Sequence, residues 1–284
     1  MRLLSFKAAD GTRLGLLRAG QVSDLSALAP ALRDVGDWLA AGDAERDDLM
    51  LRLARAPTLA LEGLEVAMPL ARPGKVVCLG LNYRDHAAEG GHAAPEYPAF
   101  FLRATSSLLA PGQPLLRPSC SDKLDFEAEL AVVIGRPARH RTLDDALACV
   151  GGYSVFNDGS LRDYQRRSSQ WTIGKNFDAT GPFGPWLVTP DDLPAGAIGL
   201  RIQSRLNGQV MQDANTASMI VSVAQAIVLL SECMTLETGD VIAMGTPAGV
   251  GYARKPPVFM RDGDTIEIEI EGIGVLANPI KDAA

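Results

Sequence analysis

Three short apolar runs constrain the fold of this chain more than any other feature of its sequence. They lie in Lys75–Leu81, Leu130–Ile134 and Gly239–Met244. Each has the length of a strand and lacks a polar face, so we expect strands that are buried on both sides. A helix is expected over Ala217–Cys233, where apolar residues recur at helical spacing. Strands and helices do not alternate as a doubly wound α/β sheet requires, so the sequence predicts a mainly β (α+β) fold.

The N-terminal part of the chain has its own pattern. Residues 1–28 carry apolar runs joined by turn signals and predict short strands, whereas apolar residues from Pro30 to about Arg55 recur at helical spacing. Pro and Gly residues punctuate Met68–Lys75, which resembles a linker. We therefore place a domain boundary there, with a small N-terminal α/β domain in residues 1–70 and a larger domain in residues 71–284.

Charge and composition narrow the classes of function. Hydrophobic residues make up 47% of the chain and charged residues 21%, as in ordinary globular proteins. Lys and Arg number 27 against 34 Asp and Glu, which argues against nucleic acid or an anionic membrane surface as a partner. No apolar run has the length of a membrane span, and the four cysteines form no C-x-x-C pair. We therefore expect a cytoplasmic protein whose cysteines stay reduced.

Acidic and apolar residues alternate in Leu124–Leu130. On a strand, Asp125, Glu127 and Glu129 would share one face, because every second side chain points the same way. Three like charges in a row repel one another unless solvent or a cation screens them. Carboxylate oxygens are the ligands that Mg²⁺ and Mn²⁺ prefer, so this segment is a candidate metal site.

A second ladder of the same kind, Asp264–Glu271, has a simpler interpretation. Its isoleucines alternate with glutamates, as in a half-buried strand whose charged face lies in water. The first ladder differs because Glu129 leads directly into the apolar stretch Leu130–Ile134, where an unpaired carboxylate would be costly. The residues alone therefore favour the first ladder only slightly.

A histidine and a glutamate follow the first apolar run. His86 and Glu89 are three residues apart, so one helical turn would bring them together. The carboxylate would then orient the imidazole as a general base, and Gly90-Gly91 would let the segment move as a lid. A histidine near a glutamate is also common on ordinary surfaces, and we interpret His92 and His140 as surface residues.

Several catalytic motifs are missing from the sequence. It contains no G-x-S-x-G elbow, no G-x-x-x-x-G-K-[ST] loop and no H-E-x-x-H pair. A serine hydrolase, a P-loop NTPase and a zinc protease are therefore disfavoured.

Eight segments of the chain, in the same order, resemble the motifs of the fumarylacetoacetate hydrolase family. They are Gly80–Glu89, Leu124–Gly135, Gly152–Asp158, Gly174–Asp178, Gly184–Trp186, Gly239–Ile242, Gly245–Gly251 and Glu271–Gly274. Any one of them is a weak signal, but together they extend over most of residues 75–280. The resemblance implies the mixed β-sandwich roll of this family, preceded by a small N-terminal domain, and a homodimer.

The resemblance also implies which residues bind metal and activate water. Glu127 and Glu129 match the paired metal-binding glutamates of the family, and Asp158 matches its third carboxylate ligand. These three residues would hold Mg²⁺ or Mn²⁺. His86 and Glu89 match the pair on the lid that activates a water molecule. Asp125 lies in the same motif as the glutamates but receives no role.

Further positions are implied to face the metal or the substrate. They include Lys175, which would stabilise negative charge or protonate a departing carbanion, together with Gln165 and Thr246. Arg162 would hold a carboxylate group of the substrate. The chain departs from the family at Gly159, where members commonly have valine, so the loop beside the metal is expected to differ.

The implied reaction is the hydrolytic cleavage of a carbon–carbon bond in a 1,3-dicarbonyl or acylpyruvate-type 2-oxo acid. Oxaloacetate-type decarboxylation and hydroxymuconate-type isomerisation or decarboxylation share the metal–enolate scaffold and are alternatives. A catalytically silent binding protein is an alternative of another class. The His86–Glu89 pair favours hydrolysis, because it provides for an activated water molecule.

Overall fold

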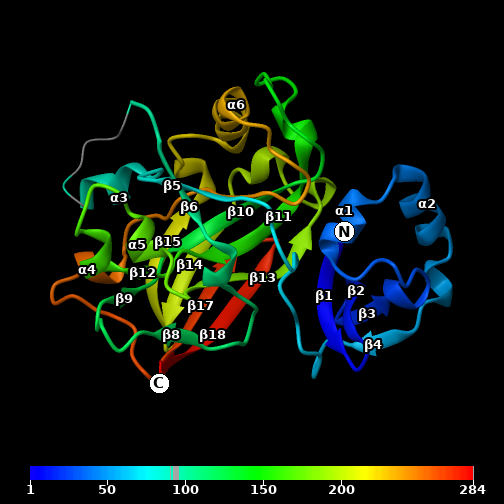
Figure 1. Cartoon of the computed structure of the whole chain (residues 1–284), viewed down its shortest axis with the longest axis horizontal. Coiled ribbons are helices and arrows are strands. Elements are labelled where there is room, and N and C mark those ends of the chain that lie inside the picture. The colour runs from blue at the N-terminus through cyan, green and yellow to red at the C-terminus, as the bar shows by residue number, and fades with distance from the viewer. Residues whose placement is uncertain (90, 92–95, 284) are drawn as a thin grey trace.

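Strands dominate the structure, as the sequence predicts. The computed structural model describes residues 1–89, 91 and 96–283 (Figure 1). The strands are β1 (Arg2–Ala8), β2 (Gly11–Arg18), β3 (Gln21–Asp24), β4 (Thr58–Ala60), β5 (Val76–Gly80), β6 (Ala99–Arg103), β7 (Leu108–Leu109), β8 (Leu115–Arg117), β9 (Leu124–Asp125), β10 (Ala128–Ile134), β11 (Val150–Asn157), β12 (Ser160–Leu161), β13 (Gly181–Val188), β14 (Arg201–Leu206), β15 (Gln209–Asn215), β16 (Val241–Ala243), β17 (Thr265–Ile270) and β18 (Gly274–Asp282). The α-helices are α1 (Val35–Ala40), α2 (Asp43–Leu51), α3 (Arg84–Glu89), α4 (Arg162–Gln165), α5 (Thr172–Lys175) and α6 (Val223–Cys233).

The three apolar runs become neighbouring strands of the main sheet. The order of this sheet is β4-β3-β2-β1-β13-β11-β10-β16-β5-β6, with β7 paired to β13. β16 pairs antiparallel with β10 and parallel with β5. Every residue of β5, β10 and β16 is buried, which confirms that these strands are covered on both faces.

A second sheet, in the order β15-β14-β17-β18-β8, packs on the main one. In Figure 1, the red strands β17 and β18 lie against the green strands of the main sheet, and one apolar core joins Leu130 and Val132 of β10 to Ile202 of β14 and Ile268 of β17. This arrangement is a β-sandwich.

The second acidic ladder lies on β17 and has the simpler of its two interpretations. Its isoleucines are buried, and its glutamates lie on the half-exposed face. Glu267 and Glu269 both pair with Arg205 of β14, at 3.0 and 2.7 Å. This ladder therefore forms an ordinary solvated strand face.

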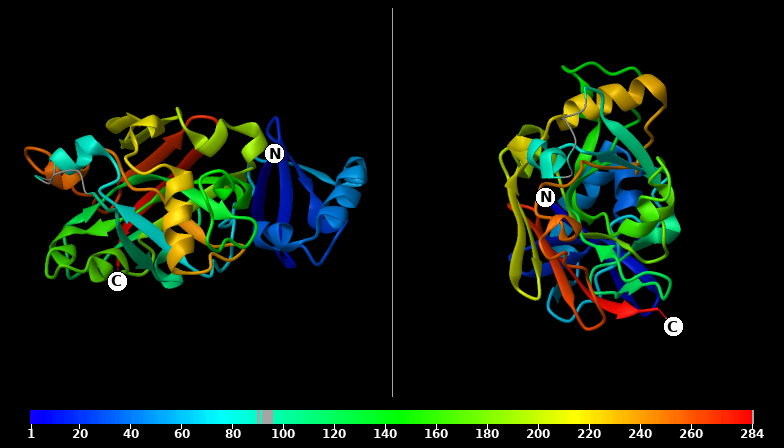
Figure 2. Two further views of the ribbon diagram at one scale, coloured as in Figure 1. Left: turned by 90° about the horizontal axis from the view of Figure 1, so that it is seen from above. Right: turned by 90° about the vertical axis from the view of Figure 1, so that its left-hand side faces the viewer.

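The N-terminal strands extend the main sheet. β1 pairs with β13 through Arg2 and Leu3, and Figures 1 and 2 show β1–β4 with α1 and α2 to one side of the molecule. The helical pattern from Pro30 to Arg55 is not one helix: α1 ends at Ala40, the backbone is extended at Ala41 and Gly42, and α2 begins at Asp43. The division into residues 1–70 and 71–284 stays a prediction.

The helix expected over Ala217–Cys233 begins later, at Val223. Ser222 and Gln225 form a capping box there, in which each side chain accepts a hydrogen bond from the other residue's backbone N–H. The residues before Ser222 are irregular apart from a 3₁₀ turn at Thr216–Ser218. Within the described part of the chain, no helix is long and apolar enough to cross a membrane.

Candidate active site

The pairing of β10 with β11 brings three carboxylates together. Ala128 lies opposite Asn157, so the chain leaving β11 places Asp158 beside Glu127, and the Asp158 N–H donates to the Glu127 carbonyl at 3.0 Å. One carboxylate oxygen of each of Glu127, Glu129 and Asp158 lies within 4.8 Å of the others, and all three residues are buried. We refer to these residues as the carboxylate triad.

Asp125 does not share a strand face with the glutamates, contrary to the simple ladder. β9 ends at Asp125 and β10 begins at Ala128, so the chain is irregular in between. The Asp125 carboxylate accepts hydrogen bonds from the backbone N–H groups of Gly251 (2.8 Å) and Tyr252 (3.0 Å) and from Nε of Arg162 (2.8 Å). Asp125 therefore ties Arg162 to the loop that follows β16.

The charges of the triad are only partly compensated. Burial raises the pKa of Glu129, and the nearby charges of Asp158 and Glu127 raise it further. Burial alone would also raise the pKa of Glu127, but Arg162 and Lys175 lower it. Lys175, the last residue of α5, donates from Nζ to both Glu127 and Asp158, and their charges raise the pKa of Lys175 against the effect of its burial. Three buried hard oxygen donors with this excess of negative charge fit a divalent cation.

The backbone N–H of Gly245 donates a hydrogen bond to Glu129, the carboxylate of the triad that Lys175 does not contact. Gly245 has a positive φ of 84°, and a Cβ there would lie 2.8 Å from Cβ of Asn82. This close approach points its N–H at Glu129, with a distance of 2.9 Å to Oε2.

His86 and Glu89 lie one turn apart on α3, as expected. Nδ1 of His86 is 3.6 Å from the Glu89 carboxylate, which also accepts a hydrogen bond from the Gly249 N–H. His86 is buried and lines the same cavity as the triad. His140 is exposed, in agreement with its interpretation as a surface residue.

Two of the sequence interpretations cannot be compared with the structure. Gly90, half of the Gly90-Gly91 hinge, and His92 lie outside the described residues.

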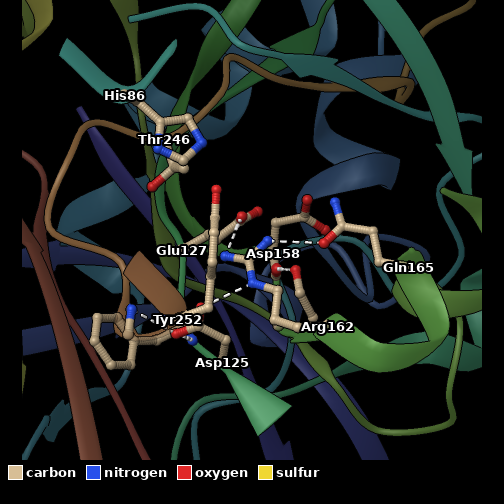
Figure 3. A network of polar contacts seen from close by, with 12 residues as sticks. His86, Asp125, Glu127, Asp158, Arg162, Gln165, Thr246 and Tyr252 are labelled. Atoms are coloured by element: carbon tan, nitrogen blue, oxygen red, sulfur yellow. Dashed lines mark hydrogen bonds and ion pairs between the residues drawn. The ribbon is translucent and has the colours of Figure 1, made fainter. Parts of the chain in front are cut away.

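Arg162 already has acceptors within the protein. It reaches Asp125 with Nε, Glu127 with Nη2 at 2.6 Å, and Oε1 of Gln165 with Nη1 at 2.9 Å (Figure 3). A substrate carboxylate would have to compete with Glu127 or Gln165 for this guanidinium. Thr246 is buried near the triad, and its hydroxyl accepts a hydrogen bond from Nε2 of Gln212 at 2.7 Å.

All the predicted site residues except Glu89 line one cavity of about 550 Å³. This size suits a small molecule. Its lining residues are Leu79, Gly80, Leu81, His86, Phe101, Glu127, Glu129, Asp158, Arg162, Gln165, Arg166, Ser168, Trp171, Lys175, Thr246 and Tyr252.

Arg103 is a charged residue at this site that sequence reasoning missed. It ends the apolar strand β6, and its side chain is fully buried. Nη1 donates to Asp158 at 2.5 Å and to the Gly159 carbonyl at 3.2 Å, while Nη2 donates to the Thr180 hydroxyl at 2.8 Å. Arg103 thus orients the Asp158 carboxylate without lining the cavity itself.

Gly159, where the chain departs from the family pattern, lets two segments meet. A Cβ at this position would lie 2.1 Å from the carbonyl oxygen of Thr180. The absence of a side chain lets the Thr180 segment approach the loop, and the Thr180 hydroxyl then reaches Arg103.

Comparison with known proteins identifies the family. The protein-family model described as "Fumarylacetoacetate (FAA) hydrolase C-terminal" matches residues 75–281 of this chain. The chain belongs to the fumarylacetoacetate hydrolase family. One relative is the human protein named "Oxaloacetate tautomerase FAHD2A, mitochondrial", which is 40% identical over 288 residues, covering 99% of this chain and 91% of that protein.

Solved structures in the fumarylacetoacetate hydrolase family share the whole fold. A fumarylacetoacetate hydrolase from Exiguobacterium antarcticum superposes with a TM-score of 0.87 at 35% identity and covers all of both chains. The maleylpyruvate hydrolase from Sphingobium sp. SYK-6, described in complex with manganese(II) and pyruvate, gives a TM-score of 0.84 at 28% identity, again with full coverage. These matches confirm the fold class predicted from the sequence.

We expect Arg103→Met to weaken the binding of Mn²⁺ by about 10- to 100-fold, because Asp158 loses the group that orients it. Isothermal titration calorimetry of the metal-free protein measures this. The control is Arg117→Met, which removes a half-buried arginine that pairs with Asp282 and does not line the cavity. Thermal unfolding verifies that each variant is folded, and Arg103→Lys tests a smaller change. A folded Arg103→Met protein with the parental Mn²⁺ affinity would show that Arg103 does not position the site.

We expect Gly159→Ala to lower the free energy of unfolding by about 1–3 kcal/mol, because the added methyl group would overlap the Thr180 carbonyl. Urea unfolding measures the difference. Gly42→Ala is the matched control, since a Cβ there meets nothing within 4 Å and the φ of Gly42 is negative. Equal unfolding free energies for the two variants would contradict the close packing at Gly159.

Proposed function

We propose that this chain is a divalent-metal-dependent enzyme that interconverts the keto and enol forms of an oxaloacetate-type 2-oxo acid. The observation that carries the proposal is the buried carboxylate triad facing His86 in one cavity. The 40% identity to the human oxaloacetate tautomerase along almost the whole chain favours tautomerisation over the hydrolysis preferred from the sequence.

The triad is proposed to hold Mg²⁺ or Mn²⁺. Three buried carboxylates with oxygens within 4.8 Å of one another match the hard-donor preference of both ions. A divalent ion held there would supply Lewis-acid polarisation of the 2-oxo group. Lys175 donates to two of the three carboxylates, so it competes with the ion for the same oxygens and would be released toward the substrate.

His86 is proposed to move the proton. Because Nδ1 faces Glu89, Nε2 is the nitrogen free to remove a proton from C3 of the substrate. The C3–H bond breaks, its electrons form the C2–C3 double bond, and the protonated His86 would return the proton to the 2-oxo oxygen, so that the enol forms and the imidazole is neutral again. The Lys175 ammonium stabilises the negative charge that develops on this oxygen. General-base assistance of this kind contributes about 10²–10⁴-fold.

Hydrolysis of an acylpyruvate-type acid is the second candidate. The same pair, His86 and Glu89, would remove a proton from water, as the family resemblance implies. The cavity of about 550 Å³ has room for a substrate larger than oxaloacetate. A silent binding protein is less well supported, because the triad, the His86–Glu89 pair and Lys175 are all in place.

A homodimer and a cytoplasmic location stay predictions from the sequence. The human relative named above is a mitochondrial protein by its name.

The test is a set of three assays on the Mn²⁺- and Mg²⁺-loaded protein: decay of the ultraviolet absorbance of enol-oxaloacetate, release of CO₂ from oxaloacetate, and cleavage of acylpyruvates. We expect the first to be fastest. His86→Asn should lower its kcat at least about 100-fold while Mn²⁺ affinity is retained, because the general base is lost and the triad is intact.

Exposed His140→Asn is the control and should keep full activity. Chelation should abolish turnover, and either ion should restore it. The proposal would be overturned if the chelated protein still accelerated enol decay above the rate without protein. It would also be overturned if His86→Asn left the catalysed rate unchanged. Acylpyruvate cleavage as the dominant activity would establish the second candidate instead.

A further inference from the structure

The buried charges around the triad leave one negative charge in excess. Four carboxylates are buried there, and three cations compensate them; the carboxylates are Asp125, Glu127, Glu129 and Asp158, and the cations are Arg103, Arg162 and Lys175. A divalent ion would reverse this excess to a single positive charge. The carboxylate next to the 2-oxo group of a substrate would neutralise that charge. The buried cluster can therefore compensate one substrate carboxylate, and a second one needs another cation.

Arg166 is an additional cation at the same cavity. It follows α4 directly, is exposed, and lines the cavity together with the triad. Among the residues that the structure describes, no carboxylate lies within 4.0 Å of its guanidinium. This guanidinium therefore retains donors for an external anion.

Aromatic stacking holds the Arg166 side chain in place. Its Cζ lies 4.6 Å from the centre of the Tyr252 ring, and Cζ of Arg162 lies 4.4 Å from the same centre. The backbone N–H of Arg166 donates to the Arg162 carbonyl at 3.3 Å, which fixes the main chain at this position. Tyr252 thus connects the guanidinium that touches the triad with the one at the exposed end of the cavity.

We propose that Arg166 makes the site selective for 2-oxo acids that carry a second, distal carboxylate. The carboxylate and carbonyl at one end of the substrate lie at the triad, and the distal carboxylate is bound by the Arg166 guanidinium on Tyr252. This inference rests on the proposed function for the position of the substrate and adds the residue that recognises its far end.

The neighbouring Arg167 provides a matched control. It is exposed like Arg166, but its Cζ lies 3.6 Å from the centre of the Tyr164 ring, and it does not line the cavity. Replacing either arginine removes one surface charge from the same turn, so a difference between the two variants reports on position and not on net charge.

The experiment compares oxaloacetate with its 4-ethyl ester, in which the distal carboxylate is blocked. Arg166→Met should lower kcat/KM for enol decay of oxaloacetate by about 10- to 100-fold and that of the ester by less than about threefold. Arg166→Lys should recover part of the loss, and Arg167→Met should change neither. Equal effects of Arg166→Met on both substrates, or the same selective loss in Arg167→Met, would overturn the inference.

A binding measurement separates this inference from the proposed function. Pyruvate and the 3,3-difluoro analogue of oxaloacetate, which cannot enolise, are titrated into the Mn²⁺-loaded protein. If the parental protein turns over neither oxaloacetate nor its 4-ethyl ester, the proposed tautomerase activity fails. If Arg166→Met lowers the affinity for the difluoro analogue but not that for pyruvate, the role of Arg166 is supported even then. If Arg166→Met changes the two affinities by the same factor, or changes neither, that role is rejected.

Discussion

Repulsion among three buried carboxylates is the constraint on which the rest of this structure depends. Glu127, Glu129 and Asp158 bring oxygens within 4.8 Å of one another in a part of the protein shielded from water. Such a cluster is unfavourable without cations, and ion pairs inside a protein stabilise only when their geometry is well matched. Lys175 and Arg103 supply part of that charge, while burial, and after it the charges of Asp158 and Glu127, raise the pKa of Glu129.

The sandwich provides the rigidity that this cluster needs. Gln212, on β15 of the second sheet, accepts from the Ala128 N–H at 3.0 Å and donates to the Thr246 hydroxyl. The Asn157 side chain accepts from the Glu127 N–H, also at 3.0 Å. Residues from both sheets therefore hold the backbone at Glu127 and Ala128 in place.

The sequence predicted those parts of the site that lie in local motifs. The His86–Glu89 spacing gave the contact on α3, and the family resemblance selected the triad from two acidic ladders of similar quality. Alternation alone would have placed Asp125 beside the glutamates, and it failed because the strand is interrupted at Phe126 and Glu127. In the same way, the helical spacing of apolar residues from Pro30 to Arg55 gives no sign of the break at Ala41 and Gly42 that separates α1 from α2.

Contacts between distant segments could not be predicted from one sequence. Arg103 meets Asp158 across 55 positions, and the only local sign of its role is a single charge at the end of an apolar strand. The reason for Gly159 is the carbonyl of Thr180 from another part of the chain. Both depend on the packing of loops around the triad, which has no period in the sequence.

The position of the bound ion tests this account most directly. Crystals of the protein soaked in Mn²⁺ and measured at the manganese absorption edge would locate it by anomalous scattering. The account predicts one strong peak about 2.0–2.4 Å from a carboxylate oxygen of each of Glu127, Glu129 and Asp158, with the Lys175 ammonium displaced from their midst. A cavity without such a peak at saturating Mn²⁺, or a peak held by other residues, would contradict it.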